Sequence, residues 1–268
     1  MSTIRTIINE HIEWRGQILK LAKSDLSKTY SGAALGWAWA IIKPTMTIAV
    51  FWFAFTFGLR FSGSVEGYPF ILWMIPGFIA WFYMGDMLTG GANAIRKYRF
   101  LVTKMKFPVS TIPTFVNLAT LVIHIGLLII VIAIFIVTGH YPDIYWLQIP
   151  FYMLLMTMGF IVWSLFAAML GAMSRDFLNL VKALKQPVFW MSGILWDVNS
   201  IEYPWMQKIL YFNPVTYIAT GYRNCFIYKT WFWQEPLQLA IYIGMFILTF
   251  LLAVWSYRKL IREIPDVL

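Results

Sequence analysis

Six stretches of this chain are apolar over lengths that suit a membrane crossing. A helix needs about 20 apolar residues to cross about 30 Å of hydrocarbon, because each residue adds only about 1.5 Å. The fifth stretch is barely long enough, and Lys182 and Lys185 lie near its inner end. The pattern predicts an all-α membrane protein with six transmembrane helices, at about residues 33–57, 69–89, 113–137, 149–173, 177–195 and 237–255.

An amphipathic segment precedes the first crossing. Apolar residues recur every three or four positions from Ile4 to Leu26, and charged residues fall mostly between them. This spacing predicts a helix in the cytoplasmic membrane interface, with its apolar side in the acyl-chain boundary. A helix packed on a soluble partner is the alternative. We therefore divide the chain into an interface helix, residues 1–32, and a six-span domain, residues 33–268.

The segment between the fifth and sixth crossings, residues 196–236, has an intermediate character. It is too polar to cross a membrane and too apolar for a free loop, and Asn213-Pro214 and Gly221 interrupt it. We expect two short re-entrant helices that dip into the outer leaflet. Lipid tolerates such helices only where they pack against protein.

Basic residues fall almost entirely on one side of these crossings. Lys and Arg near the ends of spans stay in the cytoplasm, so both termini are predicted to be cytoplasmic. Only Arg60, Lys208, Arg223 and Lys229 lie on the other side. The other seventeen of the twenty-one are Arg5, Arg15, Lys20, Lys23, Lys28, Lys43, Arg96, Lys97, Arg99, Lys104, Lys106, Arg175, Lys182, Lys185, Arg258, Lys259 and Arg262.

The composition agrees with lipid as the solvent. Charged residues make up 12% of the chain and hydrophobic residues 60%, with a mean hydropathy of +0.69, whereas soluble domains carry about 25% charged residues. The one-sided pattern accounts for most of the +9 net charge, so we expect no nucleic-acid binding. The single Cys225 cannot form an internal disulfide.

The sequence carries no recognisable pattern of catalytic or metal-binding residues. His11, His124 and His140 fall on the inner helix, in a span and on the outer side, so they do not form one metal site. The phosphate loop Gly-x-x-x-x-Gly-Lys-Ser/Thr is absent, and no acidic pair has a spacing that suits acid/base catalysis. We expect a non-enzyme without catalytic residues, metal or cofactor, which needs a partner to bind ATP and Mg²⁺ for any uphill transport.

Three polar side chains inside the crossings have two interpretations each. Lys43 either snorkels to the interface or faces a cavity, because a charge within lipid is costly. Asp86 is close enough to the cytoplasmic end of its span to be interfacial, and His124 fits a hydrogen-bonded packing residue better than a ligand. The sequence leaves open whether the three are functional or structural.

Aromatic residues make up 19% of the chain. Trp and Tyr collect at headgroup level, which accounts for most of them. Those around the re-entrant segment also offer flat stacking surfaces to sugars, with cations among them for anionic groups. This is compatible with passage of a glycosyl or polyol phosphate. The candidate outer gate or path consists of Trp190, Trp196, Tyr217, Tyr222, Arg223 and Trp231.

Several groups of residues, in order along nearly the whole chain, resemble the membrane subunits of ABC exporters of the type 2 polysaccharide class. The chain is most similar to the wall teichoic acid translocation permeases of Gram-positive bacteria. The matching groups are Asp25–Tyr30 with Leu35-Gly36-Trp37 and Pro44, Lys104–Pro108 with Pro113, Ser174–Asp176, and Asn213-Pro214 with Gly221–Arg223.

The resemblance implies a half-transporter in the bacterial cytoplasmic membrane: a homodimer of this multi-pass permease with two copies of a separate ATP-binding subunit. In such exporters the N-terminal helix and the first cytoplasmic loop contact the ATPase. Here that loop is 95–107, whose cations would meet an acidic groove and in which Phe100 or Phe107 would be an apolar anchor. The coupling residues implied are Arg96, Lys97, Arg99, Phe100, Lys104, Lys106 and Phe107.

The resemblance also implies the substrate, a lipid-linked, phosphate-bearing polymer, with teichoic acid as the first choice. Lys28 and Lys43 would attract the pyrophosphate head of the lipid carrier where the substrate leaves the inner leaflet. Export of O-antigen or capsular polysaccharide is the alternative within this class. A membrane-embedded transferase acting on a lipid-linked glycan and a passive scaffold are the alternatives from other classes.

Overall fold

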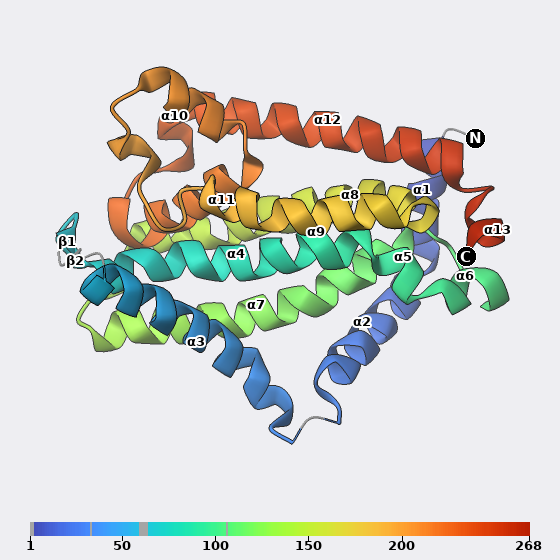
Figure 1. The fold of residues 1–268 in the computed structure, drawn as a ribbon, viewed down its shortest axis with the longest axis horizontal. Helices are drawn as coiled ribbons and strands as arrows, with labels where there is room; N and C mark the ends of the chain where they lie inside the picture. Colours follow the sequence, from blue (N-terminus) through green and yellow to red (C-terminus); the bar gives the residue numbers. More distant parts are fainter. Residues whose placement is uncertain (1–2, 33, 59–63, 106) are drawn as a thin grey trace.

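The computed structural model describes the chain except residues 1–2, 33, 59–63 and 106 (Figure 1). Five of the six predicted crossings are helices long and apolar enough to span a membrane: Gly36–Gly58, Phe70–Ala92, Thr111–Val137, Ile144–Met173 and Pro236–Leu260. Within them lie α3 (Trp39–Phe53), α4 (Phe70–Ala92), α7 (Thr111–Val137), α8 (Ile149–Met173) and α12 (Pro236–Leu260). Short 3-10 or π turns extend α3 and α8.

The fifth predicted crossing, 177–195, differs in the structure. It is α9 (Arg175–Trp190), a 16-residue helix that measures about 24 Å at 1.5 Å per residue. The chain leaves the helix at Met191, and Gly193 then adopts φ +62°, which a helix does not accommodate. Residues 191–195 are therefore a turn, and α9 lies alongside α4 and α8 (Figure 1).

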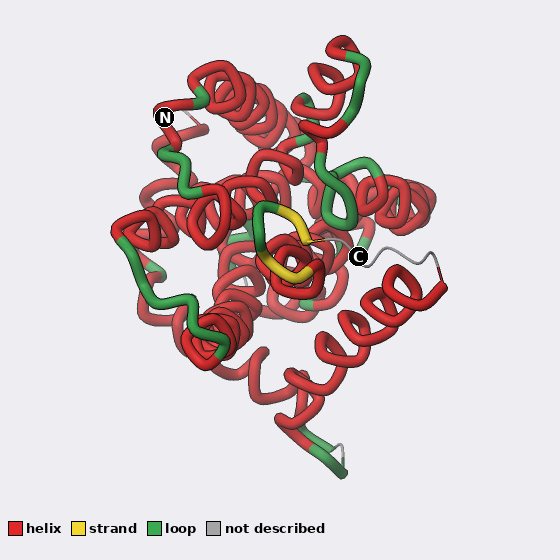
Figure 2. Tube along the Cα trace, turned by 90° about the vertical axis from the view of Figure 1, so that its left-hand side faces the viewer, coloured by secondary structure: helices red, strands yellow, loops and turns green. Residues whose placement is uncertain are grey.

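The bundle is built around α4. This helix packs against α3, α7, α8, α9 and α11, and most of its residues are buried. Figure 2 shows several of the long helices nearly end-on, gathered around one another. By contrast, α3 has no buried residue, and in Figure 1 it slants away from the bundle.

The N-terminal amphipathic segment is two helices rather than the single helix expected, α1 (Thr3–Glu13) and α2 (Arg15–Tyr30). The backbone leaves helical geometry at Trp14, with φ −98° and ψ 11°. Ile18, Ala22 and Asp25 of α2 are buried, and α2 packs against α7. A sharp reversal then leads to α3, and Gly32 and Gly36 make it possible with φ of +85° and +48°.

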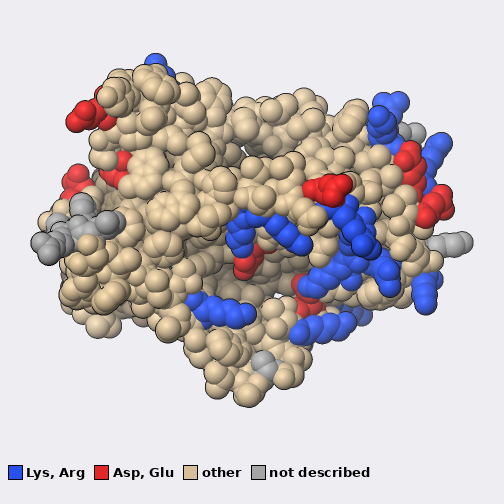
Figure 3. Space-filling view, in the orientation of Figure 1, with Lys and Arg blue, Asp and Glu red and all other residues tan. Residues whose placement is uncertain are grey.

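The N-terminal and C-terminal elements meet at one end of the bundle, which we call the basic end. It holds α1, much of α2, α5 (Ala94–Lys97), α6 (Arg99–Met105) and α13 (Ile264–Val267) (Figure 1). Most of the Lys and Arg side chains visible in Figure 3 gather toward this end. The sequence-based grouping of basic residues is therefore also a grouping in space.

The opposite end carries the shorter elements. A hairpin joins β1 (Ser64–Val65) to β2 (Tyr68–Pro69), and the positive φ angles of Glu66 and Gly67 fit the tight turn between antiparallel strands. The 196–236 segment contains the two short helices expected, α10 (Pro204–Tyr211) and α11 (Pro214–Arg223). The remaining short turns are 3-10 helices Gly36–Ala38, Ile144–Gln148, Val198–Ser200 and Phe232–Gln234, and π-helices Ala54–Gly58 and Asn224–Tyr228.

Candidate functional site

The predicted coupling loop forms α5 and α6 at the basic end, and Arg96 connects it to α8. The Arg96 guanidinium donates from Nε to the Gly171 carbonyl at 2.5 Å and from Nη2 to the Ala172 carbonyl at 2.8 Å. These carbonyls lie in the last turn of α8, where a helix has no intrahelical donors left for them. Arg96 thus caps α8, and a displacement of α5 would pull on a membrane-spanning helix.

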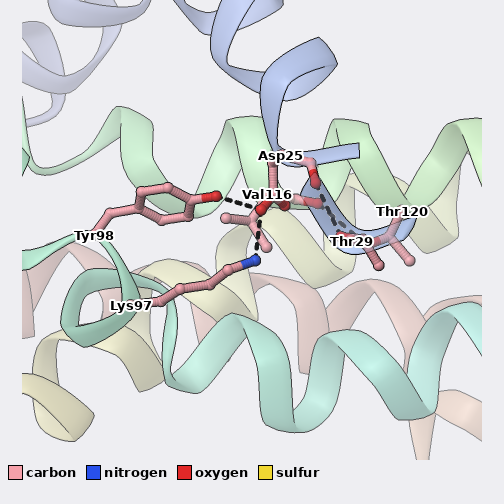
Figure 4. A network of polar contacts seen from close by, with 6 residues as sticks. All are labelled: Asp25, Thr29, Lys97, Tyr98, Val116 and Thr120. Carbon is pink, nitrogen blue, oxygen red and sulfur yellow. Dashed lines mark hydrogen bonds and ion pairs between the residues drawn. The ribbon is translucent and has the colours of Figure 1, made fainter. Parts of the chain in front are cut away.

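Lys97 and Tyr98 connect the same segment to α2. Lys97 Nζ lies 2.5 Å from Asp25 Oδ1, and the Tyr98 hydroxyl donates to the same oxygen (Figure 4). Asp25 is buried, whereas the Lys97 side chain is 46% exposed. Burial, reinforced by the hydrogen bond to Asp25, raises the pKa of the Tyr98 phenol, so it stays a protonated donor.

Asp25 is a residue of the site that was not predicted from the sequence, although the residue spacing in α2 carries a signal for it. Ile18, Ala22 and Asp25 follow one another at helical spacing, so the acid lies on the buried face of α2. A carboxylate in such a position needs a cation or donors from another element. Lys97 supplies the cation and Tyr98 supplies a donor. The sequence of α2 alone does not indicate which residues these partners are.

The remaining coupling residues divide between exposed and buried positions. Arg99 and Lys104 are exposed on α6, and Phe100 is 44% exposed. Phe107 is buried, with its ring centroid 5.0 Å from that of Trp14, so of the two candidate anchors only Phe100 is open to a partner. Lys106 lies outside the described residues.

A polar cavity of about 280 Å³ lies between the α2–α3 reversal, α4 and α7. Lys43 and Asp86 line it, together with Tyr30 and Thr120. Lys43 is exposed and lies 5.8 Å from the Trp39 ring. Of the two interpretations of Lys43, the structure supports the one in which the charge faces a cavity. Figure 3 shows a hollow in this face with basic side chains along its edges.

Asp86 connects the cavity to α9. Its Oδ1 lies 3.4 Å from Lys185 Nζ, and both side chains are exposed, so water weakens the attraction. Burial, and then the charge of Asp86, raise the pKa of the Tyr30 phenol. Lys28 does not line the cavity; it is exposed on the last turn of α2. The two predicted substrate cations therefore do not share one pocket.

Arg223 is one of the buried residues among the predicted gate residues. It is 2% exposed, and its guanidinium lies 3.7 Å from the centre of the Trp73 ring. It donates to the carbonyls of Trp73, Gly193 and Ile194, at 3.3, 2.6 and 2.5 Å. Any side chain at Gly77 would collide with it, because an added Cβ would lie 2.8 Å from Nη2. Arg223 therefore holds the turn after α9 against α4.

Tyr222 and Tyr217 are also buried. The Tyr222 hydroxyl donates to Nε2 of His124 at 2.7 Å, and Nδ1 of His124 donates to the Ile79 carbonyl at 3.1 Å. This confirms His124 as a hydrogen-bonded packing residue. Tyr217 packs on the rings of Tyr152 and Tyr242.

The three tryptophans of the predicted gate lie farther out. Trp190, at the end of α9, is 45% exposed and packs on Phe51, and its carbonyl accepts a hydrogen bond from Nε1 of Trp196 at 2.9 Å. Trp231 stacks on Trp233, with ring centroids 4.5 Å apart. The structure thus places three of the six gate candidates in the protein core and three nearer the surface.

Among the described residues, no group of three or more His, Cys, Asp or Glu is placed to hold a metal ion. The arrangement instead offers a solvent-exposed face on α6, two connections from that segment into α2 and α8, and a polar cavity beside α3.

The sequence is similar to those of known membrane transport proteins. A family model described as ABC-2 type transporter matches residues 16–227. The chain is 24% identical to the O-antigen export system permease protein RfbA of Myxococcus xanthus, over 94% of this chain and 96% of that protein. It is 22% identical to the inner membrane transport permease YadH of Escherichia coli, over 82% of this chain and 87% of that one. The chain therefore belongs to the ABC-2 type transporter family and is a multi-pass integral membrane permease.

Proposed function

We propose that this chain is the membrane subunit of an ATP-driven exporter that moves a lipid-linked polysaccharide across the cytoplasmic membrane. Permeases of this family are transport subunits that work with an ATP-binding subunit rather than enzymes. The observation that carries the proposal is the alignment of an O-antigen export permease with 94% of the chain.

We infer that the polymer is of the O-antigen or capsular class. Teichoic acid was the substrate expected from the sequence, but the relatives named above are an O-antigen export permease and a transport permease, which give teichoic acid no support. With an anionic lipid carrier, the proposed role of Lys43 is the same for either polymer. Its ammonium group would meet the carrier phosphate at the cavity beside α3.

The proposed docking face for the ATP-binding subunit is the exposed side of α6, with Arg99, Phe100 and Lys104. An aromatic ring flanked by cations is typical of an interface that meets an acidic partner groove. Arg96 and Lys97 would then transmit movement rather than bind the partner, because both already contact carbonyl or carboxylate groups of this chain.

We propose two copies of the chain and two ATP-binding subunits in the complete transporter. The support is the membrane-length helical stretch Gly36–Gly58, which contains α3 and in which one chain buries no residue. We also keep the six-crossing topology with both termini in the cytoplasm, in which α9 and the turn after it complete the fifth crossing. The position of α9 beside α4 and α8 supports this assignment.

Surface export tests the proposed substrate. Cells that lack the chain should accumulate lipid-linked polysaccharide inside and display none outside, and the wild-type chain should restore display. Lys43→Glu should restore little, because it places a negative charge where the carrier phosphate would lie, whereas Lys208→Glu, at an exposed residue of α10, should restore display fully. Loss of the chain without loss of surface polysaccharide would contradict the proposal.

Binding of the cognate ATP-binding subunit tests the docking face. Phe100→Ala should weaken this binding about tenfold, because an aromatic residue at the centre of an interface commonly contributes 1–2 kcal/mol or more. The matched control is Phe212→Ala, since Phe212 is 56% exposed at the opposite end of the bundle. Equal affinity of both variants in a pull-down or surface plasmon resonance titration would remove α6 as the docking face.

A further inference from the structure

The helix α1 contacts the protein through its polar residues. Glu10 accepts hydrogen bonds from the Tyr257 hydroxyl, with 3.1 Å to each carboxylate oxygen, and from the Ser110 hydroxyl. His11 Nε2 lies 2.8 Å from the Thr114 hydroxyl oxygen. These contacts fix α1 across the basic end, against α7 and α12 (Figure 1).

Of the apolar side chains of α1, Ile7 packs against the core of the bundle, whereas three other isoleucines stay exposed. Ile4, Ile8 and Ile12 follow one another four residues apart and are 41%, 51% and 61% exposed, so they form one stripe. An amphipathic helix that packs on its own protein normally buries this stripe. Here the stripe borders a crevice, which indicates that something outside the described chain covers it.

The crevice is large enough for a ligand. Its volume is about 480 Å³, within the range of about 300–1,000 Å³ that is common for small-molecule sites. Its other walls are Ser110 and Thr114 at the start of α7 and apolar side chains of two membrane-length helices, among them Ile161 and Val162 from α8 and Phe250 and Val254 from α12. Since these walls belong to helices that cross the membrane, the crevice opens at the depth of the lipid acyl chains.

One cation stands at the rim of the crevice. Arg15 lines it, is exposed, and has no ion-pair partner among the described residues. The apolar slot suits the acyl chain of a phospholipid, and the guanidinium at its interfacial edge suits an anionic headgroup. The phosphate would bind at Arg15 and an acyl chain would occupy the slot.

We propose that the crevice beneath α1 is a binding site for one anionic phospholipid of the leaflet at the basic end. The polar contacts of α1 hold this helix in place, and the isoleucines of α1 complete the wall around the acyl chain. Such a lipid would fix the position of α1, which leads into α2. Because Asp25 of α2 contacts Lys97 and Tyr98, the lipid would also influence the α5–α6 segment. The site is separate from the cavity at Lys43, and its test does not depend on the exported polymer.

Native mass spectrometry of the full-length permease in detergent tests the site, with dioleoylphosphatidylglycerol and dioleoylphosphatidylcholine as the two lipids. The first bound phosphatidylglycerol should be retained about five-fold more tightly than the first phosphatidylcholine, because one Arg near a membrane surface contributes about 1 kcal/mol with an anionic lipid. Arg15→Gln should abolish this preference. The matched control is Lys20→Gln, at an exposed residue of α2 that does not line the crevice.

A second pair of variants tests the acyl-chain slot. Ile161→Trp should fill the crevice and remove one bound lipid, whereas Val122→Trp, at a 52% exposed position of α7, should leave the lipid count unchanged. Circular dichroism confirms that both variants fold. Equal retention of the two lipids by the wild type, or an unchanged lipid count in Ile161→Trp, would overturn the proposal. So would dissociation of a dimer by Ile161→Trp at constant lipid count, which would assign the crevice to a second copy of the chain.

Discussion

The α5–α6 segment at the basic end and the 196–236 segment at the opposite end are each held to the bundle by basic side chains, but in different surroundings. Lys97 meets the carboxylate of Asp25 and is 46% exposed. Arg223 meets three carbonyls and the face of Trp73 and is 2% exposed. The first contact is open to water on its Lys97 side, although Asp25 is buried, whereas the contacts of Arg223 lie wholly in the protein core.

The difference teaches how the two ends can respond to force. Water can replace the contact of Lys97 at its exposed end, and the buried Asp25 keeps the hydrogen bond from Tyr98, so separating this pair costs less than separating a fully buried one. A buried guanidinium has no water to replace its carbonyl acceptors, so breaking its contacts leaves polar groups unpaired. We therefore expect the α5–α6 segment to move relative to α2 more readily than the turn after α9 moves relative to α4.

Removing Arg223 should have the largest effect. Arg223→Leu leaves the carbonyls of Trp73, Gly193 and Ile194 without their donor, so we expect the free energy of unfolding to fall by about 3–5 kcal/mol. Arg223→Lys should recover only part of this, since one ammonium cannot reach three separate acceptors. Unfolding by sodium dodecyl sulfate in mixed micelles measures the difference. A Leu variant as stable as the wild type would show that the two ends are held equally loosely.

Neutralising Asp25 should have an intermediate effect. Asp25→Asn keeps an acceptor for Tyr98 but loses the charge that attracts Lys97, so the free energy of unfolding should fall by about 1 kcal/mol. Hydrogen–deuterium exchange should increase over residues 94–105 and stay unchanged over α11. Glu13→Gln, at an exposed acid of α1, is the control. Slower or equal exchange over residues 94–105 in the Asn variant would contradict the proposed connection.

The smallest expected effect is a pH dependence of the stability, caused by an ion pair at the end opposite the basic end. Lys229 Nζ lies 3.0 Å from Asp143 Oδ2, and this hydrogen bond raises the pKa of the Lys229 ammonium above its ordinary value of 10.5. The contribution to stability is complete below that value and is lost as the pH rises through the raised pKa. Because Lys229 is 48% exposed, the loss should be at most about 0.5 kcal/mol. Thermal unfolding between pH 9 and pH 12 should show it in the wild type and not in Asp143→Asn.

Several features of the candidate site were predictable from the chain. The loop with Arg96 and Lys104, the charge at Lys43 inside a crossing and the aromatic 196–236 segment all stand out as local departures from an apolar background. Their partners did not, because Asp25 and Lys97 are separated by 72 positions and Arg223 and Trp73 by 150. A contact over such a separation depends on how the helices are arranged, which no window of the sequence records.

The sequence by itself determined lipid as the solvent, the positions of five long apolar helices and the segments in which the basic residues cluster. These features depend only on residues that are close together in the chain. A run of apolar residues is stable in lipid wherever it occurs, and the charges at its ends favour one orientation in the membrane. Only the tertiary structure decided that α9 stops at Trp190, that Phe107 is buried while Phe100 is open, and that α1 leaves its isoleucines over a crevice. Each of these depends on which neighbour covers a side chain, and neighbours in a helix bundle come from distant parts of the chain.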